Sequence, residues 1–187
     1  MKVSAEVEKA FNKAKIALMT KKNSVFITTI LFSLKYHWEP DPAKCPTAAV
    51  DGVNLYVNPD FFMDLTAKQR VTLLAHEAWH MAFSHITRAD GRDHDVWNKA
   101  GDYVINDMLV VADYEPLDPI TIEGNKTKWL HDSKYNGMST EQVYDKLVKD
   151  PQNPKNPIPD ITYSDGSNSQ GKGAGNTPDQ QKAIDQH

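Results

Sequence analysis

The segment LLAHEAWHMAFSH, from Leu73 to His85, decides how this sequence is interpreted, because it combines a helical apolar pattern with three histidines. His76 and His80 lie four residues apart, with Glu77 between them. On an α-helix, residues i and i+4 project from the same face and are separated by about 6 Å along the axis. Two imidazoles in this arrangement can both reach one Zn²⁺ ion at about 2.0–2.1 Å. The spacing therefore predicts a metal site on a helix.

Glu77 directly follows the first of these histidines, so it lies about 100° further round the helix. Its carboxylate is then poorly placed to bind the metal, but it can hold a water molecule beside the ion. Zinc lowers the pKa of such a water, and a carboxylate can accept the proton during attack on a carbonyl. The pattern H-E-x-x-H is a general signature of zinc metalloproteases. We therefore expect Glu77 to be a general base.

The residues around the motif favour a long helix. Thr66 is a suitable N-cap, and Gln69, three residues later, completes a capping box. Residues compatible with a helix, without Gly or Pro, continue from Ala67 to about Ser84. Histidine and glutamate are costly to bury on such an apolar helix unless something pairs them, and a metal ion would do so.

The third metal ligand has two candidates, and His85 is the nearer one in sequence. It lies nine residues after His76, which places it about 180° away on an unbroken helix. No glycine is present between His80 and His85 to turn the chain back. We therefore expect His85 to end the helix, where the helix dipole favours it, and not to bind the metal.

The other candidate lies in a second helix, expected from about residue 95 to residue 111. Asn98, Asp102 and Asn106 recur in it at intervals of four and therefore share one stripe. Asn and Asp are poor formers of helix interiors, so three in register need a reason. We predict Asp102 as the third ligand, with Asn98 and Asn106 in supporting hydrogen bonds. A solvated polar face is the alternative.

Other segments predict a small α+β domain followed by a polar tail. Helices are expected over residues 3–20, in the first half of 23–39, and in MSTEQVYDKL with Ser139 as its cap; a strand is expected in the second half of 23–39. A hairpin is expected from Thr47–Val50 to Asn54–Asn58, with Asp51-Gly52 at the turn. After residue 150 the chain is rich in Pro, Gly, Ser and Asn. We therefore expect a domain over 1–150 and a linker or disordered tail over 151–187.

The composition excludes several classes of protein. The 187 residues carry a formal net charge of −4, which argues against a protein that coats nucleic acid. Cys45 is the only cysteine, so neither an internal disulfide nor a cysteine zinc site can form. No apolar stretch is long enough to cross a bilayer, and the N-terminus does not read as a signal peptide. We expect a soluble cytoplasmic protein without a nucleic-acid or membrane partner.

Four segments in order resemble one known family across roughly residues 24–148. They are TAAVDGVNLYVNPDFF, LTAKQRVTLLAHEAWHMAFSHITR, WNKAGDYVIND and GMSTEQVYDKL. They are similar to a bacterial and phage metallopeptidase domain that is often fused to a von Willebrand factor A-like domain. The von Willebrand-like half is not present in this sequence, so it would be either a partner or a missing domain.

The resemblance implies an α+β, zincin-like fold, in which a small mixed sheet packs on the HExxH helix and a second helix bears a ligand. It also implies a zinc peptidase of the gluzincin or aspzincin kind, with Zn²⁺ as cofactor. His76, Glu77 and His80 carry over as the motif, and Asp102 carries over on its matching segment.

Three functions are compatible with this sequence. The first is hydrolysis of a peptide or protein substrate, which would pair with an edge strand formed by NLYVN or TAAV. Tyr103, His94 and Arg88 are candidate donors to the oxyanion, and none of them stands out. The second is a catalytically idle zincin-like binding module in a phage or stress-related complex, against which the intact Glu77 argues. The third is a zinc hydrolase that acts on a non-peptide amide.

Overall fold

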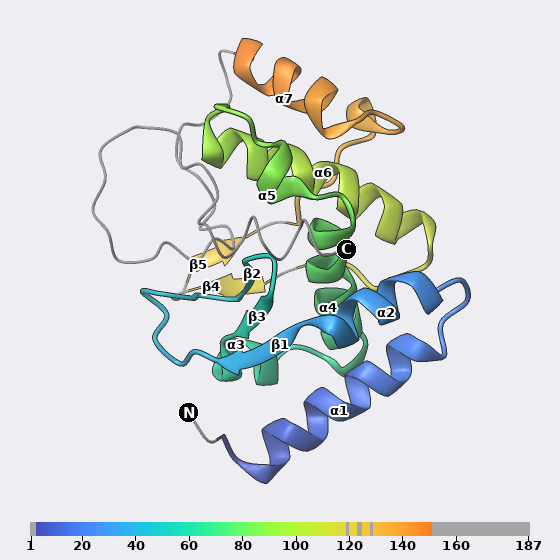
Figure 1. Ribbon diagram of the computed structural model, residues 1–187, viewed down its shortest axis with the longest axis vertical. Coiled ribbons are helices and arrows are strands. Elements are labelled where there is room, and N and C mark those ends of the chain that lie inside the picture. The colour runs from blue at the N-terminus through green and yellow to red at the C-terminus, as the bar shows by residue number, and fades with distance from the viewer. Residues whose placement is uncertain (1–2, 119, 123–124, 128, 151–187) are drawn as a thin grey trace.

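Helices flank a small three-stranded sheet in the computed structural model of the chain (Figure 1). The structure describes residues 3–118, 120–122, 125–127 and 129–150. Its elements in chain order are α1 (Ala5–Met19), α2 (Val25–Ser33), β1 (Lys35–Trp38), β2 (Ala48–Val50), β3 (Asn54–Val57), α3 (Pro59–Asp64), α4 (Ala67–Ala82), α5 (His85–Arg88), α6 (His94–Val111), β4 (Ile120–Ile122), β5 (Asn125–Thr127), the 3₁₀ turn η1 (Ser133–Tyr135) and α7 (Thr140–Lys149). The expected tail over 151–187 lies outside the described residues.

The sheet has the strand order β1-β3-β2, with β1 parallel and β2 antiparallel to β3. The β2–β3 hairpin confirms the predicted turn. The Asp51 carboxylate accepts hydrogen bonds from the backbone N–H of Val53 at 3.0 Å and of Asn54 at 2.7 Å. Gly52 has a φ of +103°, a conformation that residues with a side chain rarely adopt. A second small sheet pairs β4 with β5.

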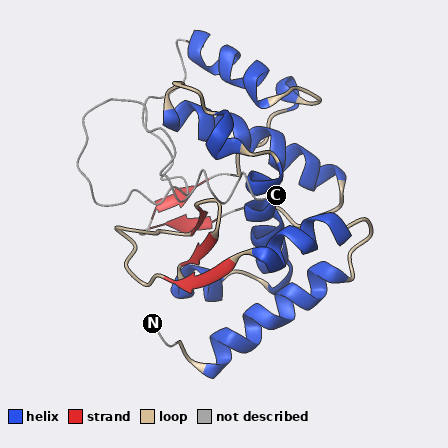
Figure 2. Cartoon of the chain, viewed as in Figure 1, coloured by secondary structure: helices blue, strands red, loops and turns tan. Residues whose placement is uncertain are grey.

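Helix α4 is the central element, since α1, α2, β2 and α6 all pack against it. Its predicted capping box is present: Thr66 Oγ1 accepts from the Gln69 N–H at 3.1 Å, and Gln69 Oε1 accepts from the Thr66 N–H at 3.1 Å. Helix α6 lies between α4 and α7 (Figure 2). Several polar side chains at the seam between α4 and α6 are buried, among them His76, Glu77 and Asp102.

Three sequence expectations need correction. The strand expected in the second half of residues 23–39 is short, because Phe32 and Ser33 still belong to α2 and extended backbone begins only at Leu34. The motif helix was expected to reach about Ser84, but α4 ends at Ala82. The helices α3 and α5 were not expected at all. None of the described helices is both long enough and apolar enough to cross a membrane.

Candidate metal centre

Three side chains from two helices converge in the seam between α4 and α6. His76 and His80 come from α4, and Asp102 comes from α6. The two Nε2 atoms lie 2.9 Å apart, and each lies 3.2 Å from Oδ1 of Asp102. All three residues are buried. The three side chains that the sequence predicted as metal ligands therefore lie together in the structure.

The donor atoms fit a tetrahedral metal ion. A tetrahedron with bonds of 2.0–2.1 Å has neighbouring ligand atoms about 3.3–3.4 Å apart, close to the 2.9 Å and 3.2 Å separations. Asp102 Oδ1 is buried and has no well-directed hydrogen-bond partner within the described part of the chain. An acceptor that is buried and unsatisfied is costly, and a cation would satisfy it. Two imidazole nitrogens and a carboxylate oxygen are a common ligand set for Zn²⁺.

Asn106 fixes the orientation of His76. The Asn106 Nδ2 group donates to the carbonyl of Leu130 at 3.0 Å, so the amide must direct Oδ1 the other way. Oδ1 lies 2.9 Å from Nδ1 of His76, and an amide oxygen can only accept. Nδ1 therefore carries the proton, and the lone pair of Nε2 faces the cluster. This confirms the hydrogen bond expected for Asn106.

His80 is contacted by His85, which corrects our geometric expectation for that residue. Ser84 adopts the left-handed conformation with φ of 52°, and this turns the chain after α4 without a glycine. His85 consequently folds back, and its Nδ1 lies 3.0 Å from Nδ1 of His80. It is not part of the three-residue cluster that could hold a metal. Burial, and then the charges of His80 and Arg88, lower the pKa of His85 to about 3, which keeps the ring neutral at ordinary pH.

Glu77 is fully buried beside this cluster. Neither of its carboxylate oxygens has a hydrogen-bond partner among the described residues. Burial, followed by the negative charge of Asp102, raises the pKa of Glu77 well above its usual range. For Asp102, burial acts in the same upward direction, but the imidazoles of His76 and His80 outweigh it and hold the pKa below the usual range. Two neighbouring carboxyl groups thus have pKa values shifted in opposite directions, which is typical of acid–base sites.

The other predicted side chains lie away from the cluster. Asn98 is 3.4 Å from the ring nitrogens of His94 near the start of α6, so the support expected from it is not found. Tyr103 packs on Tyr135, with ring centroids 4.7 Å apart, and Arg88 pairs with Glu141 of α7. His94 is exposed.

Trp129 is a neighbour of the cluster that sequence reasoning missed. Its ring centroid lies 6.0 Å from that of His76, and its Nε1 is buried without a hydrogen-bond partner within the described residues. An isolated aromatic residue in a loop gives no sequence signal for this position. The structure therefore places an unsatisfied N–H donor close to a candidate metal ligand.

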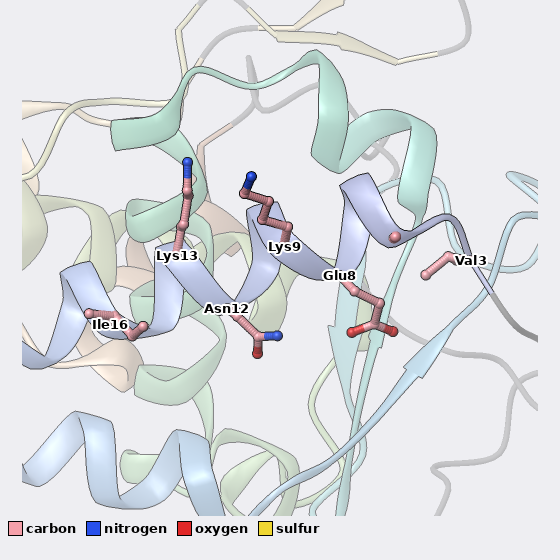
Figure 3. A pocket seen from close by; sticks show the side chains of 7 residues that line it. Val3, Glu8, Lys9, Asn12, Lys13 and Ile16 are labelled. Atoms are coloured by element: carbon pink, nitrogen blue, oxygen red, sulfur yellow. The ribbon is translucent and has the colours of Figure 1, made fainter.

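A separate hollow runs along the outer side of α1 (Figure 3). Its lining residues are Val3, Ala5, Glu8, Lys9, Asn12, Lys13 and Ile16. It shares no residue with the metal cluster and contains no group of metal-binding side chains. The candidate metal centre therefore lies at the seam between α4 and α6, and not in this hollow.

Comparison with known families gives independent evidence about the class of this protein. The sequence profile of one family matches residues 6–187, which is nearly the whole chain. Comparison with curated proteins and with solved structures found no match. The profile match is long enough to decide membership, and the chain belongs to the family described as "Putative metallopeptidase domain".

Proposed function

We propose that this chain is a zinc-dependent peptidase of the gluzincin or aspzincin kind. His76, His80 and Asp102 would hold the ion, and Glu77 would act as the general base. The observation that supports this most is the convergence of three donor atoms at near-tetrahedral distances in a buried seam, next to a buried carboxyl group without a partner. A bound zinc ion would supply polarisation of the scissile carbonyl and acidification of water.

The residues of the chain would perform the proton transfers. Glu77 takes a proton from the attacking water as the oxygen of that water bonds to the carbonyl carbon. The same carboxyl group then delivers the proton to the amide nitrogen as the C–N bond breaks. A cation held by His76, His80 and Asp102 would favour the ionised form of Glu77 and therefore its action as a base.

An extended peptide could pair with β2. This strand lies at the edge of the three-stranded sheet and packs on α4. The alternative strand that we considered, NLYVN, is excluded because it forms β3, which has strands on both sides. Backbone pairing with an edge strand gives affinity for peptides without demanding one sequence. This supports a peptide as substrate over a small amide.

A catalytically idle binding module is the competing function. Holding a metal requires the two histidines and Asp102, but it does not require a glutamate next to them. A buried carboxyl group without a partner destabilises a protein. Its presence at Glu77 is easier to understand if the residue serves the reaction.

The proposed function can be tested with a library of unfolded proteins and peptides. We expect new N-termini to appear with the zinc-loaded wild type and not with the Glu77→Gln variant, whose shape is almost unchanged. A chelator should stop cleavage, and added zinc should restore it. Zinc binding without cleavage of any substrate by the wild type would favour the idle module.

A further inference from the structure

We infer that His85 is a positioning residue that holds the imidazole of His80 with its Nε2 atom directed at the metal cluster. Hydrogen bonds from His80 to His85 and from His85 to Thr140 would then orient one histidine of the cluster, as Asn106 orients the other. This inference rests on the proposed function, because it assumes that His80 binds a metal through Nε2.

The direction of the hydrogen bonds follows from the atoms involved. If His80 binds a metal through Nε2, its Nδ1 must carry the proton and donate it. The acceptor 3.0 Å away is Nδ1 of His85, which must therefore be unprotonated. A neutral imidazole then has its proton on Nε2, and that atom lies 3.0 Å from Oγ1 of Thr140. A hydroxyl oxygen can accept this hydrogen bond, so each of the two N–H donors faces an acceptor.

Three other features of the fold hold the His85 ring in position. Ser84 adopts a left-handed conformation, which redirects the chain immediately before His85. The indole Nε1–H of Trp97 donates to the backbone carbonyl of His85 at 2.8 Å. Gly101 faces the ring so closely that an added Cβ would lie 2.8 Å from its Nδ1 and Cε1. The strained turn and the absence of a side chain at position 101 both serve to bring this one imidazole against His80.

A buried histidine needs hydrogen-bond partners in any role, so the two roles differ in what the bond to His80 contributes to metal binding. Ordered hydrogen bonds to the second nitrogen of a metal-binding histidine fix its orientation, and their loss typically weakens metal binding by about 10–100-fold. A packing role predicts instead that an apolar side chain of similar size would suffice. These two expectations separate in a measurement of zinc affinity.

The test compares His85→Leu, which has no acceptor, with His85→Gln, whose amide oxygen can accept from Nδ1 of His80. Zinc affinity is measured by competition with a chromophoric chelator, and the absorption spectrum of the Co²⁺-substituted protein reports ligand geometry. We expect His85→Leu to bind zinc about 10–100-fold more weakly and to change the Co²⁺ spectrum. His85→Gln should recover most of the affinity, and His94→Ala, at an exposed histidine, should match the wild type.

Thr140→Val is a milder second variant in case His85→Leu does not fold. It keeps the shape of the side chain at the start of α7 and removes the acceptor of the chain, so zinc affinity should fall several-fold while Thr140→Ser retains it. Unchanged zinc affinity in a folded His85→Leu or Thr140→Val variant would overturn the positioning role alone. Absence of zinc binding in the wild type would overturn the proposed function together with this inference.

Discussion

Two buried regions of this molecule differ in whether their polar atoms have hydrogen-bond partners. Around Phe11, Trp38 and Phe62 the core is aromatic, with ring centroids 5.2–5.9 Å apart. The polar atom there, Nε1 of Trp38, donates to Glu8 at 3.0 Å. At the seam between α4 and α6, in contrast, Glu77 and Asp102 keep buried carboxylate oxygens without hydrogen-bond partners among the described residues.

Helix α4 takes part in both regions, which shows that the difference is not one of secondary structure. Its first half places Val71, Leu73 and Leu74 in the hydrophobic core. Its second half carries the histidines and Glu77 into the seam. The aromatic core supplies stability, whereas buried carboxyl oxygens without hydrogen-bond partners at the seam lower it. The seam therefore has buried acceptor oxygens that a cation could satisfy.

The largest expected effect concerns catalysis at the seam. Glu77→Gln should lower peptidase activity by about 10²–10⁴-fold, the range expected for loss of a general base. The number of zinc ions bound per chain should stay the same, because Glu77 is not among the three donors. Cleavage assays on zinc-loaded protein and metal analysis of the same sample measure both. Full activity in this variant would show that Glu77 is not the base.

The next effect concerns the aromatic core. Phe62→Ala should lower the free energy of unfolding by about 3–5 kcal/mol, because it removes a fully buried ring and leaves a cavity. Denaturant titration measures this loss. The folded fraction should still bind zinc as the wild type does. If zinc affinity fell as steeply as stability, the two regions would not be separable.

A third variant removes the buried carboxyl group from the seam. Glu77→Met fills the same buried space without a polar group, so metal-free protein should become more stable by about 1–3 kcal/mol. Chemical unfolding in the presence of a chelator is the measurement. A loss of stability would mean that Glu77 has a partner after all, and that the contrast between core and seam is overstated.

The smallest effect is expected at the hairpin turn. Asp51→Ala removes an acceptor for two backbone N–H groups and should cost about 1 kcal/mol. Although burial opposes it, hydrogen bonding lowers the pKa of Asp51 below its usual value. Its contribution should therefore be present above the pKa of the unfolded chain and be lost as the pH falls through the folded pKa. The wild type should lose more stability on acidification than Asp51→Ala, and equal losses would contradict this.

Much of this arrangement is readable from the sequence, because it depends on local rules. The capping box at Thr66, the Asp51-Gly52 turn and the four-residue spacing of His76 and His80 each fix local geometry. Asn106 and Asp102 could be placed together because they share a helical stripe.

The position of His85 could not be predicted, because it depends on a left-handed conformation at Ser84 and on free space above Gly101. A serine in the sequence does not predict such a turn, whereas a glycine at that position would. The free space exists only once α6 has packed on α4. The contact between Trp129 and His76 is likewise a result of tertiary packing, without a pattern in the sequence.

Metal analysis after equilibration with zinc shows whether the seam between α4 and α6 binds a metal ion. The wild type should carry about one Zn²⁺ per chain, as expected for a single three-ligand site. His76→Ala, His80→Ala and Asp102→Asn should each lose the ion, while Asp107→Asn, on the same helix as Asp102, should retain it. Stoichiometric zinc in Asp102→Asn would remove α6 from the site, and stoichiometric zinc in the double variant His76→Ala/His80→Ala would contradict the account.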